Sequence, residues 1–552
     1  MSDDANRLEN LGYKQELTRS LTRLTNYGMT LSVVSITSGV TSLFAYGMMT
    51  GGPMVMVWGW ILVSLFTICV GLSMAEICSA YPTAGGLYFW TANLAPQQYR
   101  SMVSWFTGWF NLMGQLAGVT SVDFGLAMLV GSVISIGVGD WTPQPWHIVL
   151  IHLGLIVSHG ICNSLGRRVL LWITYISTWW QSLAPVIVAI TVLFGGKGEN
   201  HTAKFVFSTF VNRTGWTSLC CIDWSYISTW WQSLAPVIVA ITVLFGGKGE
   251  NHTAKFVFST FVNRTGWTSS VYVALIGLLQ AQFCLAGYDS AAHMSEETKG
   301  ADVAGPWGMV AALVGSSFLG WIFLVSLLTG VHNYELTVKS ETGFAVTQIL
   351  LDNFGRVWTL VLMFTLLMAC WFCGLVTVTS NSRMIYAFSR DNALPWSHFW
   401  QKVHSRFSCP LNGVWLSCTI GFILGLPYLI NSTAYSAVTS LCTICLYVAY
   451  GLPILCKLFS SIPFPHGPFH LGRFSSFINV IALLWICLIV VLFVLPTEYP
   501  VTAKNMNYAS VGFGSVLMIS SLVHIFSARF WFKGPRTNIG STTELKSSTN
   551  SE

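Results

Sequence analysis

Long apolar stretches separated by short polar segments run through almost the whole chain. A helix needs about 20 apolar residues to cross the hydrocarbon layer of a membrane. Thirteen stretches have roughly that length, at residues 29–50, 54–75, 103–131, 147–165, 169–194, 226–246, 271–291, 307–331, 357–380, 411–431, 434–457, 475–496 and 508–531. The pattern predicts an all-α polytopic membrane protein.

The composition supports this interpretation. Of the 552 residues, 53% are hydrophobic and 9% are charged, whereas soluble proteins carry about 25% charged residues. The net charge of +6 is small for this length, so we expect no nucleic acid as a partner. The cysteines lie mostly singly in apolar runs, and no catalytic or phosphate-binding motif occurs. We therefore expect neither an enzyme nor a metal or cofactor.

The two ends of the chain differ from the rest. Acidic residues before the first apolar stretch argue against a cleaved signal peptide, and the last residues are rich in Ser and Thr. The expected organisation is a cytoplasmic N-terminal segment at 1–28, a membrane-spanning domain at 29–531 and a disordered cytoplasmic tail at 532–552.

One segment occurs twice. Residues 175–218 recur without a change as residues 226–269, at an offset of 51 positions. Repeats that evolve drift apart, so an identical copy indicates a recent duplication, a splicing error or a faulty gene model. Two copies do not form a solenoid. We therefore expect twelve spanning helices, with one copy artefactual or outside the bilayer.

The distribution of Lys and Arg tests this expectation. With the N-terminus in the cytoplasm and one spanning copy, 18 of the 27 basic residues lie inside, six lie outside and three belong to the extra copy. Cytoplasmic loops are normally rich in Lys and Arg. If both copies spanned, 11 of the 18 would move outside. The charge pattern therefore favours twelve helices with both termini in the cytoplasm.

Sequons give weak further support for this topology. The loop after the fifth span would face out, and its candidate N-glycosylation sites are Asn200 and Asn212, with Asn431 in a later outer loop. They favour the secretory route, but the sequence leaves open whether the protein lies in the plasma membrane or in an endomembrane or organelle membrane.

Two spans carry signs of interrupted helices. Gly39 lies among small hydroxyl residues of the first span, and Gly287 lies in Cys284–Asp289 of the sixth. Irregular backbone at membrane depth is tolerated where it is buried in protein or lines a cavity, and broken helices of transporters bind substrate there. The alternative is that these small residues only allow close helix packing.

Charged residues inside the spans are few. Asp123 lies in the third span and Asp289 at the end of the sixth. Because a charge in the bilayer is costly, each is a functional candidate. The burial expected for Asp123 suggests that it could couple transport to a proton.

Four strings give a specific resemblance over about residues 10–535, the extra copy excepted. They are Leu11–Leu17 (LGYKQEL), Gly71–Tyr88 (GLSMAEICSAYPTAGGLY), Gly287–Thr298 (GYDSAAHMSEET) and Ser380–Asp391 (SNSRMIYAFSRD). Together they resemble the amino acid–polyamine–organocation superfamily. The chain is most similar to its plant branch of bidirectional amino acid transporters, or GABA permeases. Asn392 departs from the pattern, which usually has Gly there.

The resemblance implies a LeuT-like fold of twelve helices with two inverted five-helix repeats and alternating access. It implies amino acids, GABA among them, as substrates. It places the substrate site at Thr37, Ser38, Gly39 and Val40 in the first break and at Ala286, Gly287 and Tyr288 in the sixth. The N–H groups of Ser38–Val40 would bind the substrate carboxylate. Tyr288 would act as a lid.

The resemblance also implies charged residues at the inner face. Candidate gating residues, beside Asp123 and Asp289, are Glu296, Glu297, Arg383, Arg390 and Asp391, whose ion pairs would break and re-form. The alternative is that they are solvated loop charges. The duplication adjoins the fifth and sixth helices, which move in this fold, so it puts the activity of the full chain in question.

Three functions remain to be compared. The first is a secondary active or facilitative transporter of amino acids including GABA. The second is a transporter of choline or a polyamine, which calls for aromatic rings around a cation. The third is a receptor that resembles a transporter and senses amino acids, for which the short tail is unfavourable.

Overall fold

The computed structural model describes residues 3–139, 141–195, 254–340, 342–404, 409–431, 433–460, 464–503 and 505–536. In these residues the protein is almost entirely helical. The helices of the first half are α1 (Asp3–Asn10), α2 (Arg23–Val33), α3 (Ile36–Met49), α4 (Gly52–Ala80), α5 (Leu87–Leu94), α6 (Arg100–Val138), α7 (Pro145–Ser164) and α8 (Arg167–Gly195).

The second half continues in the same way. Its helices are α11 (Ala254–Ser259), α12 (Ser270–Gly277), α13 (Leu279–Cys284), α14 (Ser290–His293), α15 (Ala301–Thr329), α16 (Tyr334–Val338), α17 (Ala345–Arg390), α18 (Ser397–Trp400), α19 (Leu411–Gly425), α20 (Thr433–Phe459), α21 (Ser475–Val494), α22 (Ala509–Val523) and α23 (Arg529–Trp531). Single short turns are η1 (Ser295–Glu297), η2 (Leu426–Leu429), η3 (Gly472–Phe474) and the π-helical η4 (His524–Ala528). The strands β1 (Thr50–Gly51) and β2 (Val262–Asn263) pair antiparallel.

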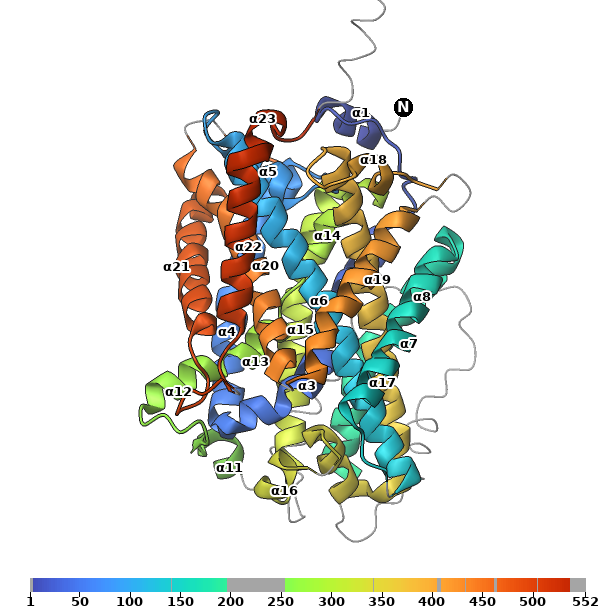
Figure 1. The fold of residues 1–552 in the computed structure, drawn as a ribbon, viewed down its shortest axis with the longest axis vertical. Coiled ribbons are helices and arrows are strands. Elements are labelled where there is room, and N and C mark those ends of the chain that lie inside the picture. Colours follow the sequence, from blue (N-terminus) through green and yellow to red (C-terminus); the bar gives the residue numbers. More distant parts are fainter. Residues whose placement is uncertain are drawn as a thin grey trace, which may run out of the picture.

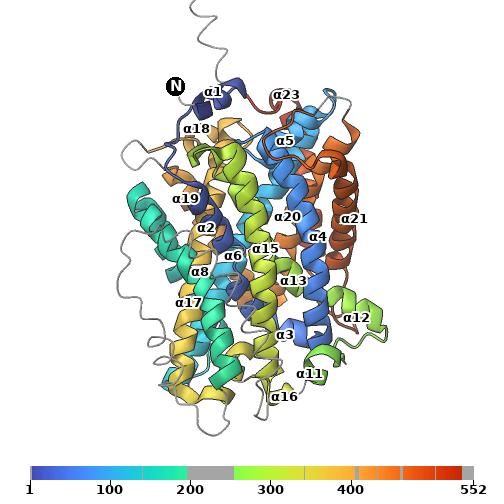
Figure 2. The same ribbon diagram turned by 180° about the vertical axis from the view of Figure 1, so that it is seen from behind.

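The long helices run side by side along the longest axis of the molecule (Figure 1). The helices α1, α5, α18 and α23 gather at one end, which we call the terminal end. The helices α11 and α16 lie at the opposite end, which we call the distal end, and both ends keep these helices in the reverse view (Figure 2).

The expected all-α membrane protein is confirmed. In the described residues, eleven helices are long and apolar enough to cross a membrane, and Ser270–Cys284 is a shorter apolar helical stretch. Each predicted span except 226–246 coincides with one of them, and 226–246 lies outside the described residues. Large apolar side chains such as Leu65, Val357 and Phe526 are exposed on the flanks, as lipid contact requires.

The ninth predicted span is longer than expected. Helix α17 begins at Ala345 and has 46 residues, whereas the pattern predicted residues 357–380. Its backbone is not helical at Gly355, where φ is 71° and ψ is 179°. Only glycine adopts this conformation readily. A short amphipathic segment therefore precedes the spanning part, and the apolar pattern identified the part after the kink.

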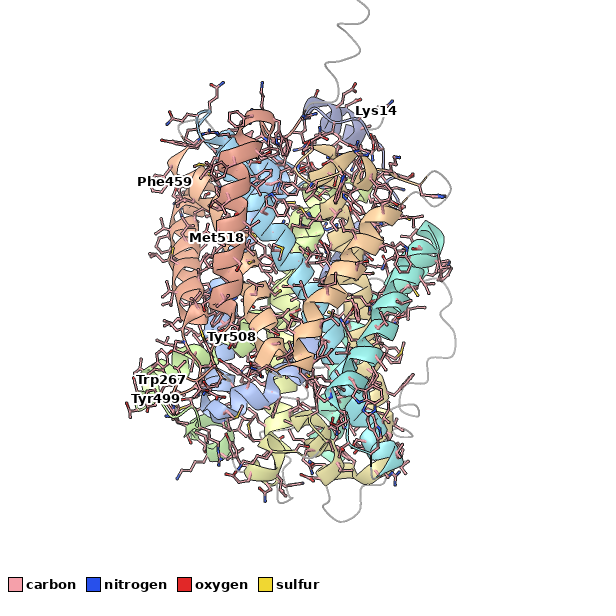
Figure 3. The ribbon with its side chains drawn as sticks, viewed as in Figure 1. Lys14, Trp267, Phe459, Tyr499, Tyr508 and Met518 are labelled. Atoms are coloured by element: carbon pink, nitrogen blue, oxygen red, sulfur yellow. The ribbon has the colours of Figure 1, made fainter. Side chains whose placement is uncertain are left out.

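The two copies of the repeat contribute different elements. The first copy continues the helix that starts at Arg167 and so forms most of α8. The second copy runs on into α12, and its residues 254–269 form α11 and β2. Trp267 of this segment packs against Tyr499, with ring centroids 5.1 Å apart (Figure 3). The flanking sequences decide this division, because only the first copy follows residues 167–174 and only the second precedes Ser270.

Candidate functional site

The first span is broken near its middle. Helix α2 ends at Val33 and α3 begins at Ile36, because the backbone of Ser35 is not helical and its hydroxyl caps α3 at the N–H of Ser38, 3.4 Å away. The prediction of a break at Thr37–Val40 was therefore displaced, since these four residues are the second to fifth of α3, which begins at Ile36.

This shift changes which backbone groups remain available. The first N–H groups of a helix have no carbonyl partner within it. The N–H of Gly39 already donates to the carbonyl of Ser35 at 3.1 Å. The N–H of Ser38 is taken by the hydroxyl of Ser35, so the groups that remain available at the start of α3 are those of Ile36 and Thr37, rather than those of Ser38–Val40.

The sixth span is broken between α13 and α14. The residues Leu285–Asp289 are not helical, so Ala286, Gly287 and Tyr288 lie in a break, where the resemblance placed it. Gly287 has φ of 88°, and a Cβ there would lie 2.7 Å from Cγ1 of Val33. A larger residue at Gly287 would therefore be strained and would also collide with the end of α2.

The two breaks enclose a small cavity of about 40 Å³. Its lining is mostly small or weakly polar and consists of Val33, Ser35, Ser38, Gly39, Gly114, Gln115, Gly118, Val122, Phe283, Cys284, Ala286, Gly287, Cys373, Thr377, Cys442 and Leu446. Gly39 lets α3 approach α13 closely, because a Cβ there would lie 2.5 Å from Sγ of Cys284. Both breaks thus border one site.

A side chain of the repeated segment holds the first break in place. Gln181 of α8 accepts hydrogen bonds from the hydroxyls of Ser35 at 2.9 Å and Thr37 at 3.3 Å. Its amide donates to the carbonyl of Ala369 in α17 at 2.6 Å. Gln181 was missed in the sequence, because only charged residues inside the spans were taken as functional candidates there, and Gln181 is uncharged.

A buried polar network begins at the sixth break. Asp289 accepts hydrogen bonds from the hydroxyl of Tyr450 at 2.7 Å and from the amide of Gln115 at 2.8 Å. Its Oδ2 also lies 3.3 Å from Nε2 of His293, one turn away on α14. Sequence reasoning singled out Asp289 but none of these partners, which come from α6, α14 and α20.

The predicted lid residue lies elsewhere in this conformation. Tyr288 is fully buried, and its ring packs on that of Tyr450 with centroids 5.0 Å apart. It does not line the cavity between the breaks. A role as a lid stays a prediction.

Asp123 is paired rather than isolated. Its Oδ2 lies 3.1 Å from Nδ1 of His159, and both side chains are fully buried. A Cβ at Gly374 would lie 2.0 Å from Oδ1 of Asp123, so this glycine makes room for the carboxylate. The sequence did not predict this pairing, because Asp123 lies on α6 and His159 on α7.

Two buried ion pairs lie between the cavity and the terminal end. Arg390 donates to both carboxylate oxygens of Glu296 at 2.9 Å, and Arg383 donates to Glu297 at 2.8 Å. All four side chains are at most 6% exposed. Two arginines of α17 thus hold the short turn η1 that follows α14. The resemblance placed these residues at one face and predicted ion pairs among them, but it did not say which arginine meets which glutamate.

Asp391 forms a further layer closer to the terminal end. Tyr13 and Tyr88 donate to its Oδ2 at 2.9 and 2.7 Å, and the N–H of Arg536 donates to Oδ1 at 3.0 Å. Burial raises the pKa of the Asp391 carboxyl, whereas Arg390 and these three donors oppose the shift. The segments near both termini therefore meet at one carboxylate.

The N-terminal segment lies across the terminal end of the site. The guanidinium of Arg390 lies 3.9 Å from the ring centroid of Tyr13. Gln15 donates to the carbonyl of Glu296 at 2.9 Å, and Arg19 donates to that of Thr298 at 2.6 Å. This segment therefore covers the ion-pair layer instead of extending away from the bundle.

A larger cavity of about 310 Å³ lies toward the distal end. It is lined by the last turns of α3, the start of α17, part of the second copy and the residues after α21, which include Tyr46, Arg264, Phe344 and Glu498. Arg264 forms an ion pair with Glu335. The second copy of the repeat thus supplies a wall of this cavity.

The candidate glycosylation sites are only partly covered. Asn200 and Asn212 lie outside the described residues. Asn431 lies between η2 and α20 and is half-buried. Asn392, where the resemblance led us to expect glycine, has φ of 59°, a left-handed conformation that Asn tolerates.

Comparisons with known proteins agree with this architecture. The sequence profile of the amino acid permease family matches residues 21–517. The amino-acid permease BAT1 of Arabidopsis thaliana is 36% identical over 547 residues, which cover 97% of this chain and 96% of that protein. The GABA-specific permease of Saccharomyces cerevisiae is 27% identical, with coverage of 97% and 86%. The choline transporter of the same yeast is 28% identical, with coverage of 86% and 75%. This chain therefore belongs to the amino acid permease family and is a multi-pass membrane transporter of amino acids rather than an enzyme.

Proposed function

We propose that this permease moves small amino acids, GABA among them, through the cavity between the two broken helices by alternating access. The observation that carries the proposal is the meeting of both breaks at one small cavity. Broken helices present N–H groups at one end and carbonyl groups at the other, which suits a ligand with a carboxylate and an amine.

Each half of such a ligand has a matching group in the site. The N–H groups of Ile36 and Thr37 would bind the carboxylate, because the N-terminus of α3 carries partial positive charge. The carbonyl groups at the end of α2 and around Ala286 would receive the amine. Gly39 and Gly287 let the two broken helices pack this closely around the site.

The layers around the cavity support an assignment of conformation. The ion pairs of Glu296 and Glu297 and the contacts of Asp391 close the terminal side, whereas the larger cavity lies on the distal side. We infer that the terminal end is cytoplasmic, as the distribution of Lys and Arg favours. The conformation is then closed toward the cytoplasm.

A choline site is less well supported. A quaternary ammonium is held by several aromatic rings. Among the described residues that line the small cavity, Phe283 is the single aromatic one. The similarity of this chain to a yeast choline transporter nevertheless requires that choline be included among the tested substrates.

Uptake of labelled GABA, alanine, glutamate and choline in transport-deficient cells tests the substrate. The full chain is compared with a chain lacking 51 residues of the repeat. Because the copies are identical, removing any window of 51 residues that begins between 175 and 219 gives the same protein. We expect this shorter chain to take up GABA or alanine. Uptake of choline alone would contradict the proposal.

The site itself is tested by a matched pair of glycine substitutions. Gly39→Ala places a methyl group against Cys284 and should reduce uptake at least tenfold. Gly154→Ala is the control, because a Cβ at Gly154 meets nothing within 4 Å. Equal uptake by the two variants, at equal amounts in the membrane, would show that the cavity is not the substrate site.

Topology is tested separately with epitope tags. A tag at the N-terminus should be hidden from antibody in intact cells, and a tag inserted beside Lys339 should be accessible. The reverse result would invert the proposed orientation. Comparison of surface and internal membranes in the same cells decides between the plasma membrane and an endomembrane.

A proton is the proposed coupling ion. The sequence suggested Asp123, which is buried and paired with His159. Facilitated exchange without a coupled ion is the alternative, and uptake with and without an inward proton gradient distinguishes the two. If Asp123→Asn left the pH dependence of uptake unchanged, Asp123 would not be the coupling residue.

A further inference from the structure

We propose that Asp289 and His293 form a proton-binding site next to the sixth break, and that one proton bound there crosses the membrane with each substrate molecule. This inference rests on the proposed transport function. It assigns the coupling step to a pair that includes His293, a residue that the sequence pattern did not single out.

The protonation of His293 can be deduced from its neighbours. Its Nδ1 lies 2.9 Å from the carbonyl oxygen of Ala84, which can only accept a hydrogen bond. Nδ1 therefore carries a proton. In the neutral ring Nε2 is then an acceptor, and it lies 3.3 Å from Oδ2 of Asp289, which is also an acceptor. One added proton on Nε2 turns this unfavourable contact into a hydrogen bond.

A second neighbour accommodates either state. The amide nitrogen of Asn111 lies 3.1 Å from Nε2 of His293 and donates to it when the ring is neutral. The Oδ1 of Asn111 is buried and has no hydrogen-bond partner among the described residues. Rotation of the amide by half a turn would bring this oxygen to face a protonated Nε2. The site thus offers a consistent set of contacts both with and without the proton.

The balance of charge favours a single proton. Asp289 and His293 are both fully buried. With neutral His293 the pair carries one negative charge, and burying an uncompensated charge is costly. Binding one proton at Nε2 gives an ion pair with no net charge. A closed state of the transporter is then favoured with the proton bound, and release follows when the pair is exposed to water on the other side.

The pair is connected to the substrate site by two routes. The hydroxyl of Tyr450 donates to Asp289 at 2.7 Å and accepts from the N–H of Gly287 at 3.2 Å. Gln115 donates to Asp289 and lines the cavity together with Gly287. A change in the charge of Asp289 is therefore felt by the backbone of the break. No comparable chain of hydrogen bonds joins Asp123 to either break in the described residues.

Other titratable groups around the pair either have partners or are phenols and thiols. On the side of Asp289 these are Tyr288, Cys442, Tyr447 and Tyr450. Toward the terminal end, Glu296 and Glu297 are paired with Arg390 and Arg383 of α17, Asp302 of α15 is paired with Arg7, and Arg23 and Tyr27 of α2 pack on Trp307. His293 is thus the side chain next to Asp289 whose ring nitrogen Nε2 has room for an added proton.

The test uses the full chain in proteoliposomes that contain a pH-sensitive dye. Labelled GABA, or alanine if GABA is not exchanged, is measured in two modes. Exchange at equal pH needs no net proton movement and normalises each variant for folding and binding. Uptake driven by an inward proton gradient measures coupling. With one proton per substrate, wild type should accumulate substrate about tenfold per pH unit and acidify the lumen.

Variants separate the pair from other buried groups. In Asp289→Asn and His293→Gln, the ratio of gradient-driven uptake to exchange should fall at least fivefold. The control His152→Gln changes a fully buried histidine of α7 and should keep the wild-type ratio. A wild-type ratio in His293→Gln overturns the inference. Loss of coupling in Asp123→Asn but not in His293→Gln also overturns it. The inference fails as well if the wild-type protein exchanges substrate but does not accumulate it when a proton gradient is applied.

Failure of the proposed function gives a different result. If wild type exchanges none of the amino acids, the proposed transport function is wrong. The presence of a proton-binding site at Asp289 and His293 is then tested without substrate. The midpoint of thermal unfolding of the solubilised protein is then measured from pH 5 to 8. The difference between wild type and His293→Gln should change with pH, while that for Gly154→Ala, which alters no titratable group, should not. A constant difference for His293→Gln overturns the site.

Discussion

The hydroxyl of Ser35 donates a hydrogen bond to Oε1 of Gln181 at 2.9 Å, and this contact joins the repeated segment to the break in the first span. Ser35 ends the interruption between α2 and α3, and Gln181 is fixed in turn by the carbonyl of Ala369. The geometry of the candidate site therefore depends on a glutamine supplied by whichever copy of the repeat forms the fifth spanning helix.

This dependence gives a test in which the same substitution is made in each copy. Gln181→Leu keeps the volume of the side chain but leaves Ser35 and Ala369 without their partner, which should cost about 1–3 kcal/mol and reduce uptake. Gln232→Leu is the same change in the second copy, outside the described residues, and should have little effect. Thermal unfolding and uptake are the measurements. A larger effect of Gln232→Leu would mean that the second copy forms the helix.

Arg390 should not be replaceable by lysine. The guanidinium binds Glu296 through two hydrogen bonds and stacks over Tyr13, which an ammonium group cannot reproduce. We expect Arg390→Lys to weaken closure on the terminal side. Thiol reagents applied from that side should then inactivate transport faster, because Cys373 lines the cavity.

The control is the partly exposed ion pair between Arg7 and Asp302 at the same end, where Arg7 is 37% exposed. Exposed pairs contribute little, typically about 0–1 kcal/mol, so Arg7→Lys should leave the inactivation rate unchanged. Equal acceleration in both variants would indicate that the Glu296–Arg390 pair is not part of the closed layer.

Glu76 and Lys457 form a buried ion pair that links α4 to α20, and Ser475 of α21 donates to the same carboxylate at 2.7 Å. Glu76→Gln leaves the ammonium group without its counter-ion and should destabilise the protein by about 3–5 kcal/mol. Replacing both residues by Met should cost much less, since no charge remains buried. Denaturation of the solubilised protein measures both effects. Equal losses would show that packing, and not charge, governs this site.

Asp391 should give the protein a specific dependence on pH. Burial raises the pKa of its carboxyl above the usual 3.8, so the folded protein binds a proton at this position more strongly than the unfolded chain. The associated stabilisation is complete below the unfolded pKa and is lost as pH rises through the folded pKa. Relative to Asp391→Asn, wild type should therefore become more stable as pH falls from 7 toward about 4.

Thermal unfolding midpoints of the two solubilised proteins check this direction. Tyr13→Phe removes one hydrogen-bond donor to Asp391, and a lost donor raises the pKa of a carboxyl further. In this variant the gain in stability on acidification should therefore begin at a higher pH. A difference between wild type and Asp391→Asn that stays constant or reverses over this range would contradict the assignment.

The spans could be predicted well from the sequence, because each needs a long run of apolar residues whatever its neighbours are. Helix α17 shows where this reasoning ends, since its amphipathic first part before Gly355 lies outside the apolar run. The sixth break was located correctly, because Gly287 has a backbone conformation that favours glycine. The first break was misplaced, because it is set by the cap of Ser35 and by Gln181, a residue 146 positions away.

The sequence by itself determined the membrane class, the family, the repeat and the residues that carry charge near the sites. It could not determine that Asp289 meets His293, Gln115 and Tyr450, that Arg390 meets Glu296, or that the first copy forms α8 while the second lines the distal cavity. The physical reason is that burial of an apolar segment depends on its own composition. A buried polar group, in contrast, must find its partner on whichever helix the packing brings beside it.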